Sequence, residues 1–304
     1  MISALKKSIA TGVLLAGSVG AAIAADTLKP FVLAYTTGGD IEQVAGDVKE
    51  KLGTAGFEIA GSYSPYDGAL ILAITNDTLK KAAASSEFGG YAAGQRVTLT
   101  QVDDEIQVSY TNPLYYGSAY RLKETASLNQ VADALQTALG KTETFGTGDK
   151  QLSDSDLRKY RYMFGMERFN NPSELASYKS YDEAIAAVEQ GLNSGAGGAS
   201  KVYRIDIPGK QETVFGVALT EGCSGDEYIM SRIDRDNLRS TGHLPYEILV
   251  SGGDVYALYA RFRIAISWPH LPMIASQTGA TFFNIMCAPN AIEESLIKAA
   301  GGRV

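Results

Sequence analysis

The chain has 304 residues, of which 45% are hydrophobic and 20% charged, with two His, two Cys and a formal net charge of −7. This is the composition of a globular protein, and it excludes disordered, collagen-like and disulfide-dense chains. The length suggests two domains, each large enough to bury a core. An acidic chain is unsuited to following a phosphate backbone, which needs clustered Lys and Arg, so no nucleic-acid partner is expected.

The first residues have the three parts of a secretory signal peptide. Lys6 and Lys7 form a positive n-region, residues 9–24 are uncharged and small or apolar, and Ala22-Ile23-Ala24 has the small-x-small pattern of a cleavage site. The uncharged run is shorter than the roughly 20 residues that a transmembrane helix needs. We therefore predict a signal peptide at 1–24, cleavage after Ala24, and a soluble periplasmic or secreted protein with no membrane span after cleavage. Losing the two lysines changes the net charge from −7 to −9.

Residues 25–145 are predicted to form a first domain. Aromatic and β-branched residues between turn signals predict strands at 31–36, 57–63, 69–75, 96–102 and 105–112. Apolar residues at helical spacing predict a helix capped by Asp40, a short helix after Asn76, and a third helix that begins at a Ser127/Gln130 capping box. Gly140 is expected to end this third helix.

A polar linker at 146–159 is predicted to precede a second domain, 160–304. Strands are expected at 160–166, 201–207, 213–220, 244–250 and 255–267. Helices are expected after a Ser180/Glu183 capping box, around 226–233, and from Pro289 onward. Both halves then have the order strand, helix, two strands, short helix, two strands, helix. This order predicts an α+β fold of two tandem, divergent domains, each an antiparallel sheet with helices on one face.

Segments in both halves resemble the protein family called domain of unknown function 302. In the second half these are HLPYEILV at 243–250 and ALYARFRIAI at 257–266, followed by Ser267-Trp268-Pro269; in the first half they are 96–102 and VSYTNP at 108–113. The resemblance implies two copies of a strand-helix-four strands-helix domain with a curved sheet, similar to each half of the TATA-binding protein. The family has no established activity, so the resemblance implies no catalytic residues.

The two cysteines, Cys223 and Cys287, both fall in the second half. In an oxidising compartment two cysteines most simply form one disulfide. Two alternatives remain at this level: a pair of buried free thiols, or a redox role for Cys287, because a helix N-terminus favours a thiolate. A thiol assay on the exported protein separates them.

The only histidines are His243 and His270, and each is close to a proline at the end of a predicted strand. Together with Met273 and Cys287 they could bind a soft metal ion such as copper. The alternative is that both histidines simply cap or solvate strand ends, because no HxH, HxxxH or CxxH spacing is present.

The predicted strand at 255–267 offers a candidate ligand surface. Alternation places Tyr259, Arg261 and Arg263 on one face. Two arginines beside a tyrosine could hold a small anion or an acidic partner. The alternative is a solvated sheet face with cross-strand ion pairs.

No GxSxG, P-loop, HExxH or GxGxxG motif is present, so we predict no catalytic residue and no cofactor. The favoured hypothesis is a non-catalytic binding or accessory protein of the cell envelope, whose partner is a small anionic ligand or an envelope protein. One alternative is a periplasmic redox or metal-handling protein that uses the Cys, His and Met residues of the second half. Another is a hydrolase whose Ser, Asp and Glu residues the sequence does not place.

Overall fold

The computed structural model describes residues 27–303, so the predicted signal peptide lies outside the described residues. We call residues 27–145 the first half and residues 160–303 the second half. The first half contains the strands β1 (Phe31–Thr37), β2 (Glu58–Tyr63), β3 (Ala69–Thr75), β4 (Gln95–Val102), β5 (Glu105–Thr111) and β6 (Glu143–Phe145). Its helices are α1 (Ile41–Thr54), α2 (Asp77–Ala84), the short 3-10 helix η1 (Gly89–Ala92), α3 (Pro113–Ala119) and α4 (Ala126–Leu139).

The second half follows the short helix α5 (Asp154–Arg158) and contains the strands β7 (Ser173–Ser177), β8 (Ala199–Asp206), β9 (Glu212–Leu219), β10 (Tyr246–Ser251) and β11 (Asp254–Ala257). Its α-helices are α6 (Tyr181–Asn193), α7 (Asp226–Ile233), α8 (Ala260–Ser267) and α9 (Ala288–Ala299). The 3-10 helices η2 (Ala196–Gly198), η3 (Gly222–Ser224), η4 (Thr241–His243) and η5 (Phe282–Ile285) connect them.

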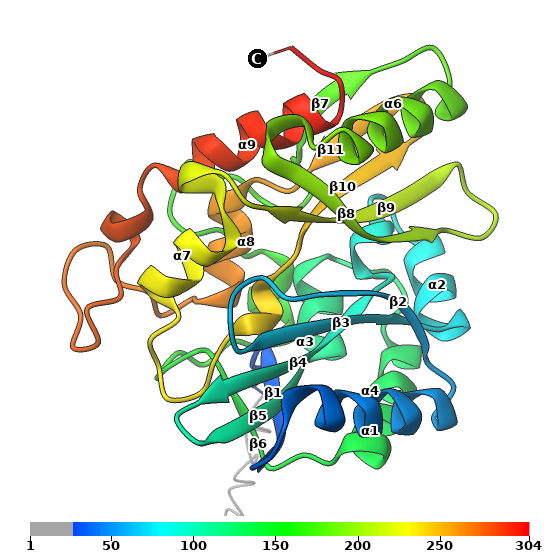
Figure 1. Ribbon diagram of the computed structural model, residues 1–304. Coiled ribbons are helices and arrows are strands. Elements are labelled where there is room, and N and C mark those ends of the chain that lie inside the picture. The colour runs from blue at the N-terminus through cyan, green and yellow to red at the C-terminus, as the bar shows by residue number, and fades with distance from the viewer. Residues whose placement is uncertain (1–26, 304) are drawn as a thin grey trace, which may run out of the picture.

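The two halves build sheets of the same topology. The first sheet has the order β2-β3-β4-β5-β1-β6 and the second β7-β11-β10-β9-β8, and every strand pair is antiparallel. Without β6, the strand that follows the first helix of each half lies at one edge and the opening strand at the other. Figure 1 shows the layers: α6 and α9 lie outside the second sheet, α1 and α4 lie outside the first, and the sheets are in the middle. The predicted α+β fold class is confirmed.

The sheets are covered on both faces, which explains the sequence pattern of their central strands. All residues of β3 and of β9 are buried, so β3 is an almost continuous apolar run, and β9 is one after its first two residues, Glu212 and Thr213. One hydrophobic cluster includes residues of both sheets, among them Leu72 of the first half and Tyr203 and Leu249 of the second. The two halves therefore share part of their core.

Each half also inserts a short segment against the sheet of the other half. In η1, the backbone N–H of Gly90 donates to Glu212 Oε1 of β9 at 2.8 Å. In η4, Thr241 Oγ1 lies 2.8 Å from Thr100 Oγ1 of β4. The first half thus places η1 against the second sheet, and the second half places η4 against the first sheet.

Two predicted strands are wrong. Residues 160–166 form no strand, and the opening strand of the second half is β7 at 173–177. The predicted strand at 255–267 is divided: β11 ends at Ala257, and residues 260–267 form the helix α8. Nearly every residue of α8 is buried, so it has no polar stripe that would reveal a helical period.

Most of the helix ends predicted from capping residues agree with the structure, unlike the predicted strand at 255–267. Asp40 accepts from the N–H groups of Glu42 and Gln43, and Gly140 (φ 92°) ends α4 as predicted. Ser180 caps α6, whereas α4 begins one residue before Ser127 and is not capped by it. The boundaries at 145 and 160 between two domains stay a prediction.

Candidate functional site

The three residues predicted on one strand face are separated by the helix that replaces it. Tyr259 is the N-cap of α8. Arg261 reaches outward and forms a forked ion pair with Glu167, with Nη2 2.5 Å from Oε1. Arg263 points into the interior, where it is 3% exposed. The structure therefore does not bring these residues together as one anion site.

Arg263 instead belongs to a buried ionic cluster between the halves. Glu247 on β10 accepts from Arg263, from Arg96 Nη2 of β4 at 2.5 Å, and from the Tyr203 hydroxyl at 2.7 Å. The second Nη of Arg263 donates to the backbone carbonyls of His243 and Pro245. Both Glu247 oxygens are engaged, and Arg96 Nε is the one buried guanidinium nitrogen of the cluster without a partner among residues 27–303. The cluster therefore holds one half against the other through its buried ion pairs.

The histidines and Met273 do not assemble a metal site. His243 is buried, with its two ring nitrogens 2.9 Å from Ser267 Oγ and 3.0 Å from the Tyr246 hydroxyl. Burial, and after it the charges of Arg263 and Arg96, hold its pKa well below the ordinary value, so the imidazole is neutral.

His270 contacts the Gly146 carbonyl at 3.1 Å and Asp236 Oδ2 at 3.0 Å, while Met273 Sδ accepts from the Tyr162 hydroxyl. The predicted set thus occupies separate hydrogen-bonding environments. Within residues 27–303, no three His, Cys, Asp or Glu side chains are placed to hold a metal ion.

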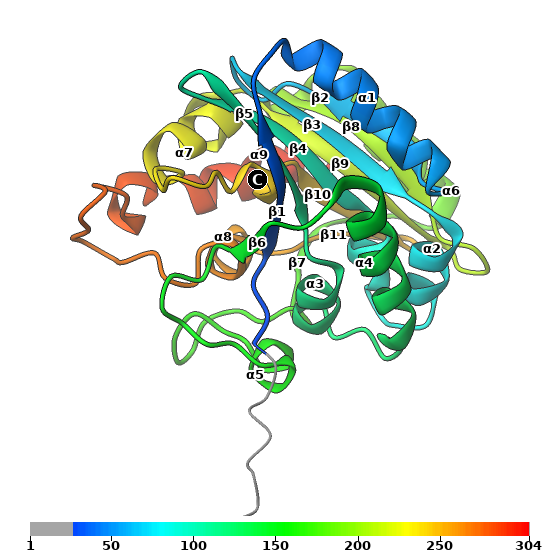
Figure 2. The same ribbon diagram turned by 90° about the horizontal axis from the view of Figure 1, so that it is seen from below.

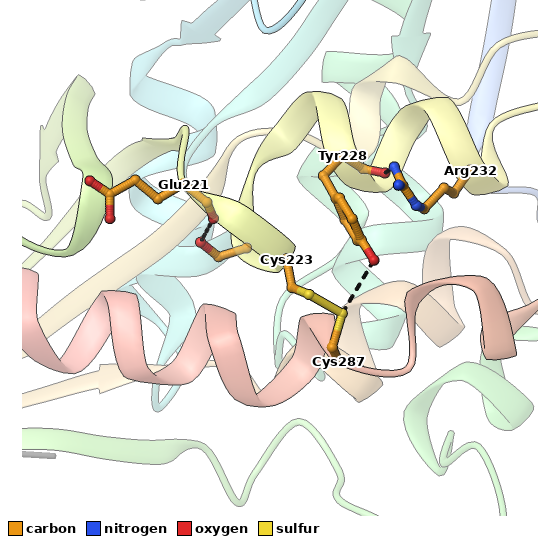
Figure 3. The surroundings of a disulfide bond; sticks show 6 residues. Glu221, Cys223, Tyr228, Arg232 and Cys287 are labelled. Carbon is orange, nitrogen blue, oxygen red and sulfur yellow. Dashed lines mark hydrogen bonds between the residues drawn. A yellow bond between two sulfur atoms is a disulfide. The ribbon is translucent and has the colours of Figure 1, made fainter.

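Cys223 and Cys287 are bonded to each other, with Sγ atoms 2.11 Å and Cα atoms 5.9 Å apart. Figure 3 shows that the bond links the short helix η3 to the start of α9, and that the Tyr228 hydroxyl points at Cys287, 3.3 Å from its Sγ. The Tyr228 ring lies 3.5 Å from the Arg232 guanidinium. The bond therefore ties α7, η3 and α9 together at one end of the second half.

Two buried carboxyl groups escaped the sequence analysis. Asp226, at the start of α7, accepts from the Tyr63 hydroxyl and the Leu219 N–H, and burial raises its pKa to about 7. Asp234, just after α7, accepts from the Ser240 N–H, and burial likewise raises its pKa to about 7. Each carboxyl has its own partners, and the second oxygen of each is buried without a hydrogen-bond partner among residues 27–303.

The most distinctive surface is apolar and belongs to two segments of the second half, 160–171 and 268–287. They carry all six large hydrophobic side chains that are exposed within residues 27–303: Met163, Phe164, Met273, Ile274, Phe283 and Met286. Figure 2 shows both segments on the same side of the molecule, in green and orange. The Tyr162 ring stacks on Phe282 at 6.3 Å and so joins the two segments. We call this the apolar surface.

A pocket of about 90 Å³ opens between the same two segments. Tyr162, Met163 and Met166 line it from one side, α8 lines it with Ile264 and Ala265, and Trp268, Met273 and Phe282 line it from the other segment. Arg261 is the one charged residue in the lining. The pocket is suited to an apolar group, and its lining offers no carboxylate, imidazole or thiol for catalysis.

Trp268, the only tryptophan of the chain, lines this pocket and a second one beside His270. Its side chain is 2% exposed, yet its Nε1 has no hydrogen-bond partner among residues 27–303. A buried indole N–H normally finds an acceptor.

The sequence analysis predicted Arg261 as an anion-binding residue and Met273 as a metal ligand, and it missed the apolar surface. A usable signal was present: residues 264–292 contain no Asp, Glu, Lys or Arg. The comparison of the halves is a second signal, because α3 and α4 are joined by residues 120–125, whereas the corresponding helices α8 and α9 are joined by residues 268–287. The longer connection builds half of the pocket.

Comparisons of the chain with models of protein families, with curated proteins and with solved structures found no match. None of the helices within residues 27–303 combines the length and the apolar character that crossing a bilayer requires. Function is therefore inferred from this chain's own residues.

Proposed function

We propose that the protein is an exported, non-catalytic binding protein of the cell envelope that takes an apolar group of its ligand into the pocket beside Trp268. The observation that carries this proposal is the coincidence of the pocket with the apolar surface: every strongly exposed large hydrophobic side chain of the described chain lies on the two segments that form it. Exposed apolar patches on globular proteins commonly mark binding sites.

Export is supported by the signal-like residues 1–24 and by the bonded cysteine pair, which suits an oxidising compartment. We further propose that the two halves arose by duplication of a domain resembling the domain of unknown function 302 family, with a sheet like that of the TATA-binding protein. Their equal strand order supports the duplication.

The size of the pocket limits what it holds. A volume of about 90 Å³ has room for about three water-sized or methylene-sized groups. We therefore expect the end of an alkyl chain or a branched aliphatic group to enter. At about 0.8 kcal/mol for each buried methylene, the pocket contributes about 2.4 kcal/mol, or about 50-fold in affinity.

The test uses the fluorescence of Trp268, the one tryptophan of the chain, which lines this pocket. Trp268 also lines a second pocket beside His270, so a variant of Ala265, which lines only the first, assigns the signal to the proposed site. Titration with 1-octanol, an uncharged chain with a hydroxyl, is expected to change the emission saturably. Ala265→Leu fills the pocket from α8 and should weaken binding about 50-fold. The matched control is Ala186→Leu on the exposed face of α6, which should bind as the wild type does. An unchanged emission in the wild type, or equal affinities for all three proteins, would rule the pocket out.

A further inference from the structure

The apolar surface has a basic border, although the chain as a whole carries a net charge of −7. The Arg161 guanidinium lies over the Phe164 ring, 5.1 Å from its centroid. Arg168 follows on the same segment, and the next residue, Phe169, stacks on Tyr120 at 5.2 Å, which brings Arg121 into the same region. Burial and the neighbouring charge of Arg168 lower the pKa of Arg121, as expected of two cations close together.

None of these three arginines forms a salt bridge within residues 27–303. Two carboxylates close to them in sequence are engaged elsewhere: Glu167 pairs with Arg261, and Glu124 accepts from Ser127. The border therefore carries positive charge that no carboxylate within residues 27–303 pairs with. Uncompensated arginines are suited to phosphate groups.

The other segment of the surface completes an amphipathic arrangement. Ile274 is 80% and Phe164 is 90% exposed, and both lie beyond the pocket lining. Ile274 belongs to the run 264–292 that has no Asp, Glu, Lys or Arg, so no such charged side chain of this run opposes its transfer into an apolar medium. Protruding aliphatic and aromatic side chains beside arginines are the composition of a surface that lies in the headgroup region of a membrane.

We propose that the apolar surface docks on a bilayer containing anionic phospholipid, with Phe164 and Ile274 entering the acyl region and Arg121, Arg161 and Arg168 contacting phosphates. This rests on the proposed function, because docking would place the mouth of the pocket at the depth of the lipid chains. The three arginines favour a bilayer over an apolar protein surface, because such a surface would leave them without anions, whereas a layer of phosphates supplies anions along the whole border.

The test is cosedimentation of the purified chain with vesicles of phosphatidylglycerol and phosphatidylethanolamine. We expect binding that falls with added salt and is at least tenfold weaker on phosphatidylcholine vesicles. Arg121→Gln with Arg168→Gln should weaken binding about 30-fold, because each arginine near an anionic membrane surface contributes a similar share of the binding free energy. Phe164→Ser with Ile274→Ser should weaken it by at least tenfold. The control, Lys141→Gln with Lys179→Gln, makes the same charge change at two exposed lysines outside this surface and should bind as the wild type does.

The 1-octanol titration keeps the two proposals apart. The arginine double variant should retain wild-type binding of 1-octanol, which also shows that it is folded. If the wild type binds 1-octanol but does not sediment with vesicles, docking is wrong and the pocket stands. Equal binding to both kinds of vesicle, equal losses in the arginine and lysine variants, or self-association through this surface in the absence of lipid would each overturn the docking proposal.

Discussion

The buried cluster around Glu247 offers the sharpest test of how the halves are held together. Glu247→Gln keeps the shape of the side chain but removes the charge shared by Arg96 and Arg263. Three donors converge on this carboxylate, and all three residues are no more than 3% exposed. Three hydrogen bonds to a charged group would sum to about 4.5–9 kcal/mol, but ionic desolvation already opposes part of that. Removing one partner of a buried ion pair costs about 3–5 kcal/mol, and we expect that loss.

Urea unfolding followed by circular dichroism measures the loss, and the melting temperature should fall by on the order of 10 °C. The matched control is Glu189→Gln, because Glu189 also pairs with two cations, Lys201 and Arg204, but at the surface. It should cost less than about 1 kcal/mol. Adding Arg96→Met to Glu247→Gln should recover part of the loss, because one of the two stranded cations is then gone. If Glu247→Gln is no more destabilising than the surface control, the reasoning about the cluster is refuted.

Two further predictions concern the second half. Replacing Cys223 and Cys287 together by Ala should lower the free energy of unfolding by about 4 kcal/mol, the loop-closure value for a separation of 64 residues; a loss below about 1 kcal/mol in urea unfolding would contradict it. The pKa of Asp226 is about 7 in the folded chain and about 3.9 in an unfolded one. The stability that its raised pKa contributes is therefore fully present below about pH 4 and is lost as the pH rises through 7. The difference in free energy of unfolding between Asp226→Asn and the wild type should therefore be more favourable to the variant at pH 8 than at pH 4.5. A difference that does not vary with pH would count against the burial of that carboxyl.

Much of the fold could be predicted because its signals are local. A cap such as Asp40 acts on N–H groups two and three residues away, and Gly140 ends α4 through its own backbone conformation. Strands such as β3 are recognisable from β-branched and aliphatic runs between turns. The α+β class and the repeated order of elements follow from such features, since each depends on a few neighbouring residues.

The candidate site was less accessible because its residues meet only across the fold. Arg261 and Arg263 are two positions apart, yet one pairs with Glu167 on another segment and the other with Glu247 in the core. A strand pattern placed them on one face, whereas α8 separates them. Helix α8 was missed because it is buried nearly all round, which erases the polar stripe on which helix recognition depends.

The sequence by itself determined an acidic α+β protein with two similarly ordered halves, a signal-like N-terminus and one pair of cysteines. Only the tertiary structure decided that the cysteines meet, that the histidines and Met273 do not, and that segments 160–171 and 268–287 combine into an apolar surface with a pocket. The physical reason is that exposure is a property of the packed chain: Phe164 and Ile274 read as ordinary core residues until the fold leaves them without cover.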